Sequence, residues 1–509
     1  MTEVTYMDSS AHTNIVGIEA KAAQWDGTDS GQPTTNRLVS LITAVPRLDV
    51  TRFLHGANGR ERYYWSEPSG SDSDGLTIAG FGVAAMLSVQ PVLDDDISIT
   101  PAGYRFDEIE RQTEALFDKA IIREVEIEAA HQDNMLLDSL PANDHPARPR
   151  LFGGFAFQDD FIPDNTWSMF CPAQFVLPHY QVVHTNGGTY MTINTLVDGN
   201  ESLHESLAGI REALIDRVDA MLGGQARPIG DTHLRYPMSP EAWSAIIDRA
   251  TQAIRDGLLE KVVLSRVCEV RSNELIDGAA TLDYLNDSYG DCFRFLFEPY
   301  PQHTFFGATP ELLVRKEGEQ VTTMALAGSI ARGRTVDEDE SLAQQLLDSG
   351  KNRHEHQLVA QAILASLEGA VDDLITAADP VVLPLRNIQH LLTPIHGRIV
   401  TGEAGLLSLV RRLHPTPAMG GVPTDEAMTF LRRSEPVPRG WYAAPIGWID
   451  AHGDGVFAVA IRSAVIQHDR AWLYAGAGIV ADSQPEYEWA ETALKFRPML
   501  GALGVEENV

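Results

Sequence analysis

The sequence contains little cysteine: only Cys171, Cys268 and Cys292, far apart and without a CxxC pair. This pattern suggests neither a disulfide framework nor a thiolate zinc site. The N-terminus lacks the basic segment and apolar run of a secretory signal peptide. No apolar run reaches the roughly 18 residues that a membrane-spanning helix needs. We therefore expect a soluble, cytoplasmic protein of a reducing compartment that does not engage a membrane.

Positive charge is also scarce. The chain has 509 residues with 39 Lys and Arg against 71 Asp and Glu, a formal net charge of −32. A nucleic-acid-binding protein needs basic surface to neutralise phosphates, so this balance argues against a nucleic-acid partner. Hydrophobic residues at 44% and charged residues at 22% are ordinary for a globular protein, and the length is sufficient for a large core.

The texture of the chain changes near residue 238. Residues 1–35 are rich in Ser, Thr, Asp and Gly without periodicity, and we expect a mobile tail. Residues 36–237 form a strand-rich region of short apolar runs, among them a predicted hairpin at 175–194 that turns at Asn186-Gly187-Gly188. A helical pattern interrupts these runs at 206–222.

The segment 238–506 opens with a helix signal. Ser239 suits the N-cap and Pro240 the first helical position, and apolar residues follow at helical spacing. Strands and helices then alternate without a regular βαβ repeat or any internal repeat of 20–50 residues. Long antiparallel strands with helices outside them, an α+β fold, fit this pattern best. The boundary at 238 is compatible with a seam inside one fold.

Two predicted helices carry acidic residues of interest. In the helix at 349–371, Glu355 points with the apolar stripe; alternatively, it is a helix-start glutamate that reaches solvent. In the helix at 485–500, Glu488, Glu491 and Lys495 share one face, which is also the pattern of a solvated face with one ion pair. The preceding glycine-containing strand at 472–480 suggests close approach of a ligand or of another backbone. If it is a ligand, carboxylates beside the strand could hold Mg²⁺.

Lys261 and Glu311 are two further candidates. Lys261 opens an apolar strand at 261–270, and partial burial there would lower its pKa toward neutrality; an edge-strand lysine in water is the alternative. Glu311 follows Pro310 between two strand-like runs, where an exposed turn glutamate is the alternative. Motifs of zinc proteases, dinucleotide-binding folds, P-loops and α/β-hydrolases are absent.

Taken together, nine collinear segments resemble the chorismate-utilising enzymes, a family that includes isochorismate, salicylate, anthranilate and aminodeoxychorismate synthases. The segments are KVVLSR (261–266), FFGATPELLVRK (305–316), ALAGSIARGR (325–334), KNRHEHQLV (351–359), NIQHLLTPIHGRI (387–399), HPTPAMGGVP (414–423), PRGWYAAPIGW (438–448), VAIRSAVI (459–466) and AGAGIVADSQPEYEWAETALK (475–495). The resemblance implies the family's fold, in which large antiparallel sheets pack as a sandwich with helices outside.

Ala327 bears on the subfamily. Para-aminobenzoate-type relatives carry a nucleophilic lysine in a PIKGT motif, where this chain has Ala327, so the resemblance excludes that covalent mechanism. Ala325-Leu326, Ser329 and the N-terminal pieces RERYYWSEP, GFGVAA and FGGFAFQ resemble the longer isochorismate synthases that often serve menaquinone synthesis. The expected activity is conversion of chorismate to isochorismate by a monomer without an amidotransferase partner. Salicylate synthase and anthranilate synthase large subunit are the alternatives, and the sequence leaves a siderophore pathway equally open.

The resemblance also implies roles for single residues. Lys261 becomes the general base and Glu311 the general acid. Glu355, Glu488 and Glu491 correspond to the acidic magnesium site, with Glu488 acting through water. The positions that correspond to substrate-binding residues are Gly328, Ser329, His390, Tyr442, Arg462, Gly476, Gly478 and Lys495.

Overall fold

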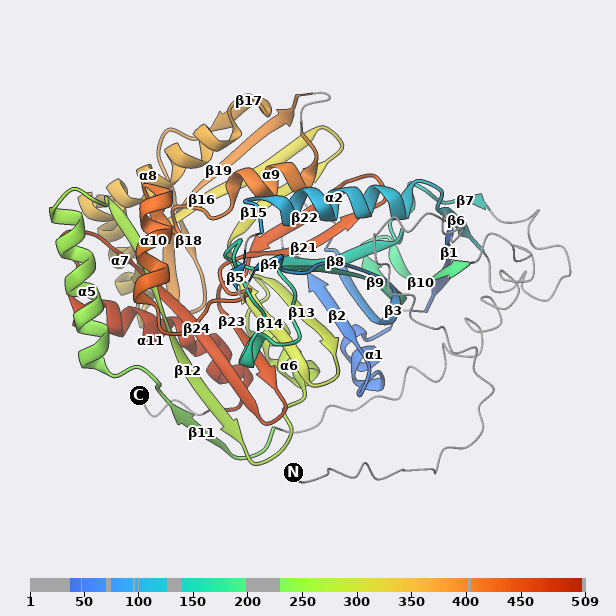
Figure 1. Ribbon diagram of the computed structural model, residues 1–509, viewed down its shortest axis with the longest axis horizontal. Coiled ribbons are helices and arrows are strands. Elements are labelled where there is room, and N and C mark those ends of the chain that lie inside the picture. The colour runs from blue at the N-terminus through green and yellow to red at the C-terminus, as the bar shows by residue number, and fades with distance from the viewer. Residues whose placement is uncertain are drawn as a thin grey trace, which may run out of the picture.

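The computed structural model describes residues 37–46, 48–69, 75–94, 97–98, 100–125, 140–197, 229–400 and 404–505 (Figure 1). Strands predominate and pair antiparallel, except that β1 and β6 run parallel. This architecture confirms the predicted α+β class. None of the helices in the described ranges has the length and apolar character that crossing a bilayer requires.

The strands form two arms of one sheet that meet at β9. The first arm runs in space through β6 (Ile121–Glu124), β1 (Arg37–Val45), β10 (Gly188–Val197), β9 (Ala173–Thr185), β3 (Thr77–Val89), β2 (Arg62–Ser66), β13 (Phe293–Tyr300), β14 (His303–Thr309), β23 (Ser463–Gln467), β24 (Arg470–Ile479) and β12 (Lys261–Ser272). The strands β11 (Thr232–Arg235) and β20 (Gly421–Val422) pair with opposite ends of β12.

The second arm leaves β9 in the other direction. It passes through β8 (Arg150–Phe155), β21 (Pro445–Asp450), β22 (Gly455–Val459), β15 (Leu312–Glu317), β16 (Gln320–Ala331) and β19 (Ile388–Ile399), with β17 (Val371–Thr376) and β18 (Val381–Pro384) on the far side of β19. Short strands β4 (Leu93–Asp94), β5 (Ile97–Ser98) and β7 (Leu140–Pro141) complete the set. Because β9 pairs with both β3 and β8, it joins the two arms.

A shared apolar core holds the arms together. Trp65 and Phe305 from the first arm and Trp448 from the second belong to one continuous group of buried side chains. Strand pairs β2–β13 and β8–β21 also connect segments on both sides of residue 238. We propose that the two regions separated at residue 238 form one fold.

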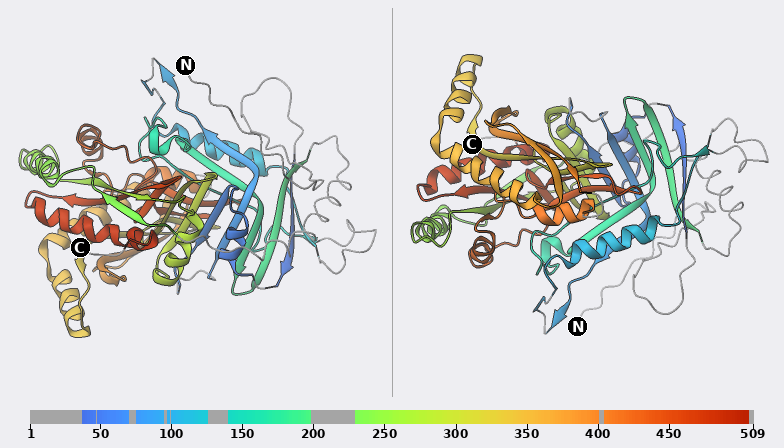
Figure 2. Two further views of the ribbon diagram at one scale, coloured as in Figure 1. Left: turned by 90° about the horizontal axis from the view of Figure 1, so that it is seen from below. Right: turned by 90° about the horizontal axis from the view of Figure 1, so that it is seen from above.

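Helices cover the sheet from outside (Figure 2). They are α1 (Val50–Gly56), α2 (Tyr104–Phe117), α5 (Pro240–Arg255), α6 (Gly278–Ser288), α7 (Val336–Asp348), α8 (Gly350–Leu367), α9 (Leu406–Leu413), α10 (Thr424–Ser434) and α11 (Pro485–Ala502), with a 3₁₀ turn η2 (Asn165–Trp167). Helix α8 packs on β16 and β19, and α11 packs on β24 and α5. These two helices therefore approach the sheet from different arms.

Local predictions can be compared with these elements. The hairpin at 175–194 is confirmed as β9–β10, and Ser239 caps α5 by accepting a hydrogen bond from the Ala242 N–H. The helix predicted at 485–500 is confirmed as α11. The helix predicted at 349–371 is confirmed as α8, but it ends at Leu367 because Gly369 adopts φ +76° and Val371 begins β17. The predicted tail at 1–35 and the predicted helix at 206–222 lie outside the described residues.

Candidate active site

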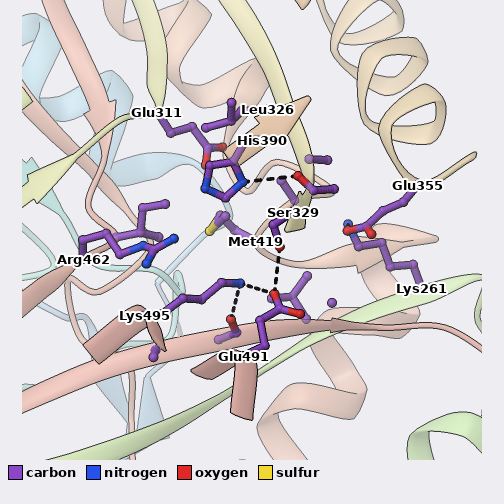
Figure 3. A pocket seen from close by; sticks show the side chains of 18 of the residues that line it. Lys261, Glu311, Leu326, Ser329, Glu355, His390, Met419, Arg462, Glu491 and Lys495 are labelled. Atoms are coloured by element: carbon purple, nitrogen blue, oxygen red, sulfur yellow. Dashed lines mark hydrogen bonds and ion pairs between the residues drawn. The ribbon is translucent and has the colours of Figure 1, made fainter. Parts of the chain in front are cut away.

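A cavity of about 220 Å³ lies where the two arms face each other. Strands β12 and β24 supply one wall, and β16 and β19 supply another. Helix α8 contributes side chains from its first two turns, and α11 contributes Glu491 and Lys495 from its middle. Twelve of the thirteen site residues predicted from the sequence line this cavity (Figure 3). The thirteenth, Glu488, is not among the lining residues and lies one helical turn before Glu491 in α11.

Lys261 occupies the first position of β12 and is buried, with 1% of its surface exposed. Side chains alternate across a strand, so Lys261 and Val263 face the cavity while Val262 and Leu264 enter the core. The ammonium Nζ donates a hydrogen bond to Glu355 Oε1 at 2.8 Å. The alternative of an edge-strand lysine in water is therefore excluded, since β12 pairs with β24 on one side and β20 on the other.

Two glycines of β24 provide the space around this ion pair. A Cβ atom at Gly478 would lie 3.0 Å from Glu355 Oε1 and 3.0 Å from Lys261 Cε. A Cβ atom at Gly476 would lie 3.1 Å from the Tyr442 hydroxyl oxygen. The glycines thus mark close approach of side chains of the site, whereas the close approach of a ligand stays a prediction.

Glu311 lies between β14 and β15 and has only 4% of its surface exposed. Burial raises the pKa of its carboxyl group to about 8, although Lys261, Lys495 and Arg462 act in the opposite direction. The carboxyl group is therefore protonated at neutral pH. In Figure 3 Glu311 lies beside His390, on the side of the cavity away from Lys261.

His390 on β19 is a neutral imidazole. Burial and then the charges of Arg462 and Lys495 lower its pKa to about 3. Its Nδ1 lies 3.3 Å from the Gly328 carbonyl oxygen, which can only accept, so Nδ1 carries the proton. Its buried Nε2 has no hydrogen-bond partner among the described residues, and is left as an acceptor at the cavity.

The irregularity in β16 that His390 contacts contains Gly328 and Ser329. Gly328 has φ +77°, a conformation that favours glycine, and a Cβ atom there would lie 3.1 Å from Asn352 Cβ in α8. Ser329 donates a hydrogen bond to Glu491 Oε1 at 3.4 Å. This part of β16 therefore lies close to both helices that carry the acidic residues.

Helix α11 brings three charged side chains to the site. Lys495 Nζ lies 2.6 Å from Glu491 Oε1 and donates to the Gly476 carbonyl oxygen at 2.8 Å. Burial acts to raise the pKa of Glu491, but the charge and hydrogen bond of Lys495 outweigh it and lower this pKa. Burial, with the neighbouring charge of Glu491, raises the pKa of Glu488 to about 7.

Arg462 and Tyr442 form the remaining wall. Arg462 is 8% exposed and has φ +49°, which places it in the left-handed region between β22 and β23. Burial lowers its pKa from the ordinary arginine value. Tyr442 stacks on Tyr474 with ring centroids 5.1 Å apart, and burial raises its pKa to about 12.

Some lining residues were not singled out from the sequence. Lys351 and Asn352 come from the first turn of α8, and Met419 comes from the loop before β20. All three lie within segments that carry the family resemblance, so position within those segments was the available signal.

The carboxylates suit a hard cation such as Mg²⁺, which prefers oxygen ligands. Among the described residues, no group of three or more His, Cys, Asp and Glu side chains is gathered closely enough to hold a metal. Glu355 instead contacts Lys261, and Glu491 contacts Lys495. The acidic pair Glu488 and Glu491 nevertheless fits a cation, because a positive charge there would relieve the repulsion by Glu491 that, after burial, raises the Glu488 pKa.

Comparison with known proteins identifies the family. A family model described as chorismate binding enzyme matches residues 23–504. The chain belongs to the chorismate-binding enzyme family.

Among other chorismate-binding enzymes, isochorismate synthase MenF of Bacillus subtilis is 33% identical over 474 residues, which cover 92% of this chain and 94% of the relative. The salicylate biosynthesis isochorismate synthase of Pseudomonas aeruginosa is 37% identical over 70% of this chain and 75% of the relative. The crystal structure of MenF, the menaquinone-specific isochorismate synthase of Escherichia coli, matches the fold with a TM-score of 0.72 at 23% identity, over 93% of this chain and 96% of that one.

Proposed function

We propose that this chorismate-binding enzyme is an isochorismate synthase, which converts chorismate to isochorismate. The observation that supports it best is the placement of a buried lysine and a buried, protonated glutamate on different sides of one cavity. The relatives named as isochorismate synthases support the same activity.

The proposed reaction uses two proton transfers. Lys261 takes a proton from a water molecule whose oxygen bonds to C2 of the ring. The ring double bonds shift, and the C4–O bond breaks as Glu311 gives its proton to the leaving hydroxyl. One water is consumed and one is released, so the net change is an isomerisation. A carboxyl group with a pKa of about 8 holds its proton at neutral pH, as a general acid must.

Ala327 argues against a covalent lysine intermediate. It lines the cavity from β16, at the position where aminodeoxychorismate synthases carry a nucleophilic lysine. A methyl group cannot form a covalent adduct with the ring. From the relatives named as isochorismate synthases, we propose that the enzyme requires neither ammonia nor an amidotransferase partner, and that it works as a monomer in the cytoplasm.

The substrate carries two carboxylates, and the cavity offers cationic groups for them. We assign Lys495 and the Gly478 N–H to the ring carboxylate, and Arg462 with Tyr442 to the enolpyruvyl carboxylate. Gly328, Ser329, Gly476 and His390 would surround the ring. The Nε2 of His390 is suited to accept a hydrogen bond from a substrate hydroxyl, because it is deprotonated and has no protein partner among the described residues.

Glu355 and Glu491 are proposed as direct ligands of Mg²⁺, with Glu488 acting through water. When bound, the cation would neutralise the ring carboxylate beside these acidic side chains. Glu355 and Glu491 come from helices on different arms, so a ligand set drawn from both would also hold α8 and α11 at the cavity.

The deciding experiment incubates the purified chain with chorismate and Mg²⁺, separates products by HPLC and assays pyruvate in parallel. Isochorismate approaching an equilibrium mixture without pyruvate supports the proposal. Salicylate with equimolar pyruvate would indicate a salicylate synthase, and anthranilate formed only with ammonia would indicate an anthranilate synthase. Gel filtration measures the oligomeric state.

A further inference from the structure

A buried ion pair contacts the backbone of β12, the strand that carries Lys261, and does not line the cavity. Glu435 follows α10, and Arg439 comes four residues later, with side chains 8% and 2% exposed. The guanidinium donates to both carboxylate oxygens: Nε to Oε2 at 2.8 Å and one terminal nitrogen to Oε1 at 2.6 Å. This two-bonded geometry fixes the plane of the guanidinium.

The remaining donors of Arg439 reach two other segments. One terminal nitrogen donates to the Val263 carbonyl oxygen at 2.6 Å, and the other donates to the Met419 carbonyl oxygen at 2.8 Å. Glu435 Oε1 also accepts a hydrogen bond from the Ser265 N–H at 2.8 Å. The pair is therefore bonded to β12 at two residues and to the Met419 loop at one.

Each of these segments carries a cavity residue. Val263 and Met419 line the cavity themselves, and Lys261 lies two residues before Val263 on the same face of β12. The backbone of Arg439 adds a third link, because its carbonyl oxygen accepts from the Tyr442 N–H at 2.9 Å. A single residue thus connects the proposed base, the apolar Met419 wall and the proposed substrate-binding tyrosine.

We propose that Arg439, held by Glu435, is a positioning residue that sets where Lys261 lies relative to Met419 and Tyr442. This inference rests on the proposed function. Burying an ion pair brings little net stability compared with apolar packing, whereas a misplacement of about 1 Å in an active site can cost about 100-fold in rate. A loss of rate that exceeds the effect of the accompanying drop in Tm therefore reports on the geometry of the pair.

The test replaces Arg439 by lysine, which keeps the charge but cannot supply the planar fork of donors. We expect R439K to lower kcat by about 10- to 100-fold and to change KM by less than about threefold. The matched control is R62K. Arg62 is equally buried and paired, with Glu298 at 2.6 Å and Asp277 at 2.8 Å, but it does not line the cavity.

E435Q is the second variant, because it retains size while removing the carboxylate that orients the guanidinium. Chorismate affinity is measured by calorimetry on E311Q and on E311Q/R439K, where turnover is blocked. Similar affinities together with a loss of kcat confined to R439K and E435Q support the inference. A kcat within twofold of wild type in either variant, or an equal loss in R62K at the same drop in Tm, would overturn it. A wild-type chain that makes no isochorismate would overturn the proposed function itself.

Discussion

Lys261 Nζ and Glu355 Oε1 lie 2.8 Å apart across the cavity. The contact joins the first residue of β12 to the second turn of α8, so it connects elements of the two arms. Under the proposed function it also connects the general base with a metal ligand. A cation bound by Glu355 would compete with the ammonium for the same carboxylate oxygen.

Replacing Lys261 by alanine tests the base. We expect K261A to lower kcat by about 10²- to 10⁴-fold, the usual contribution of a positioned acid or base, while chorismate binding changes little. Steady-state kinetics and calorimetry measure the two effects. K316A is the control, because Lys316 forms a similar 2.8 Å ion pair with Asp454 and does not line the cavity. Near-wild-type turnover of K261A would remove Lys261 from this role.

The pH dependence of turnover tests Glu311. Its carboxyl group must be protonated to act as the acid, and its pKa of about 8 predicts full protonation at pH 6–7 and loss above about 8. We expect kcat to fall with rising pH by about tenfold per unit beyond that point. E311Q should be folded and inactive. A kcat that stays level up to pH 10 would show that another group supplies the proton.

The same pKa makes a separate prediction about stability. The folded state holds the Glu311 proton up to about pH 8, whereas the unfolded chain releases it near 4.5. Stability therefore declines as pH rises between these two values and is constant above them. E311Q lacks this titration. As pH rises from about 5 to 8, the Tm of wild type should therefore fall relative to that of E311Q. A Tm difference that is constant over this range would contradict burial as the cause of the shift.

The sequence was sufficient to predict the elements that carry the site. Ser239-Pro240, Asn186-Gly187 and Pro485 are local signals, and the helix starts and the hairpin turn lie where these signals place them. Spacing alone did not show that Glu355 and Lys261 meet, because 94 residues separate them. Only the collinear resemblance brought these residues into one predicted site.

Other relationships depend on packing that no local pattern encodes. The neutral state of His390 follows from its complete enclosure beside Arg462 and Lys495, which lie on different elements. No sequence pattern singled out Arg439, and its bonds to Val263 and Met419 become apparent only in the folded chain. Residue type was therefore informative for chemistry, and the fold was needed for the partners.

Magnesium binding tests the acidic set without relying on turnover. A cation that binds only the folded state raises Tm in proportion to the logarithm of its concentration beyond Kd. We expect wild-type Tm to rise with Mg²⁺. E491Q should need about tenfold more Mg²⁺ for the same rise, because it lacks one charged ligand and binds the cation more weakly. E486Q is the control, because Glu486 is exposed in the first turn of the same helix. An unchanged Mg²⁺ titration of E491Q would exclude Glu491 as a ligand.

Gly478 tests the space around the Lys261–Glu355 contact. Its backbone lies in a region open to alanine, so G478A adds a methyl group without backbone strain. That methyl carbon would lie 3.0 Å from both Glu355 Oε1 and Lys261 Cε, closer than most real contacts, and it would push the pair apart. We expect kcat to fall about 10- to 100-fold, as for a misplaced catalytic group.

The matched control is G350A, because no atom lies within 4 Å of a Cβ at Gly350, which is also a residue of the helix that carries Glu355. It should leave kcat within about twofold of wild type, and its Tm should not fall, since alanine favours the helix more than glycine does. If G478A retains full activity, the Lys261–Glu355 contact does not need its observed geometry. The Lys261–Glu355 hydrogen bond of 2.8 Å would then be a feature of the enzyme without substrate that turnover does not require.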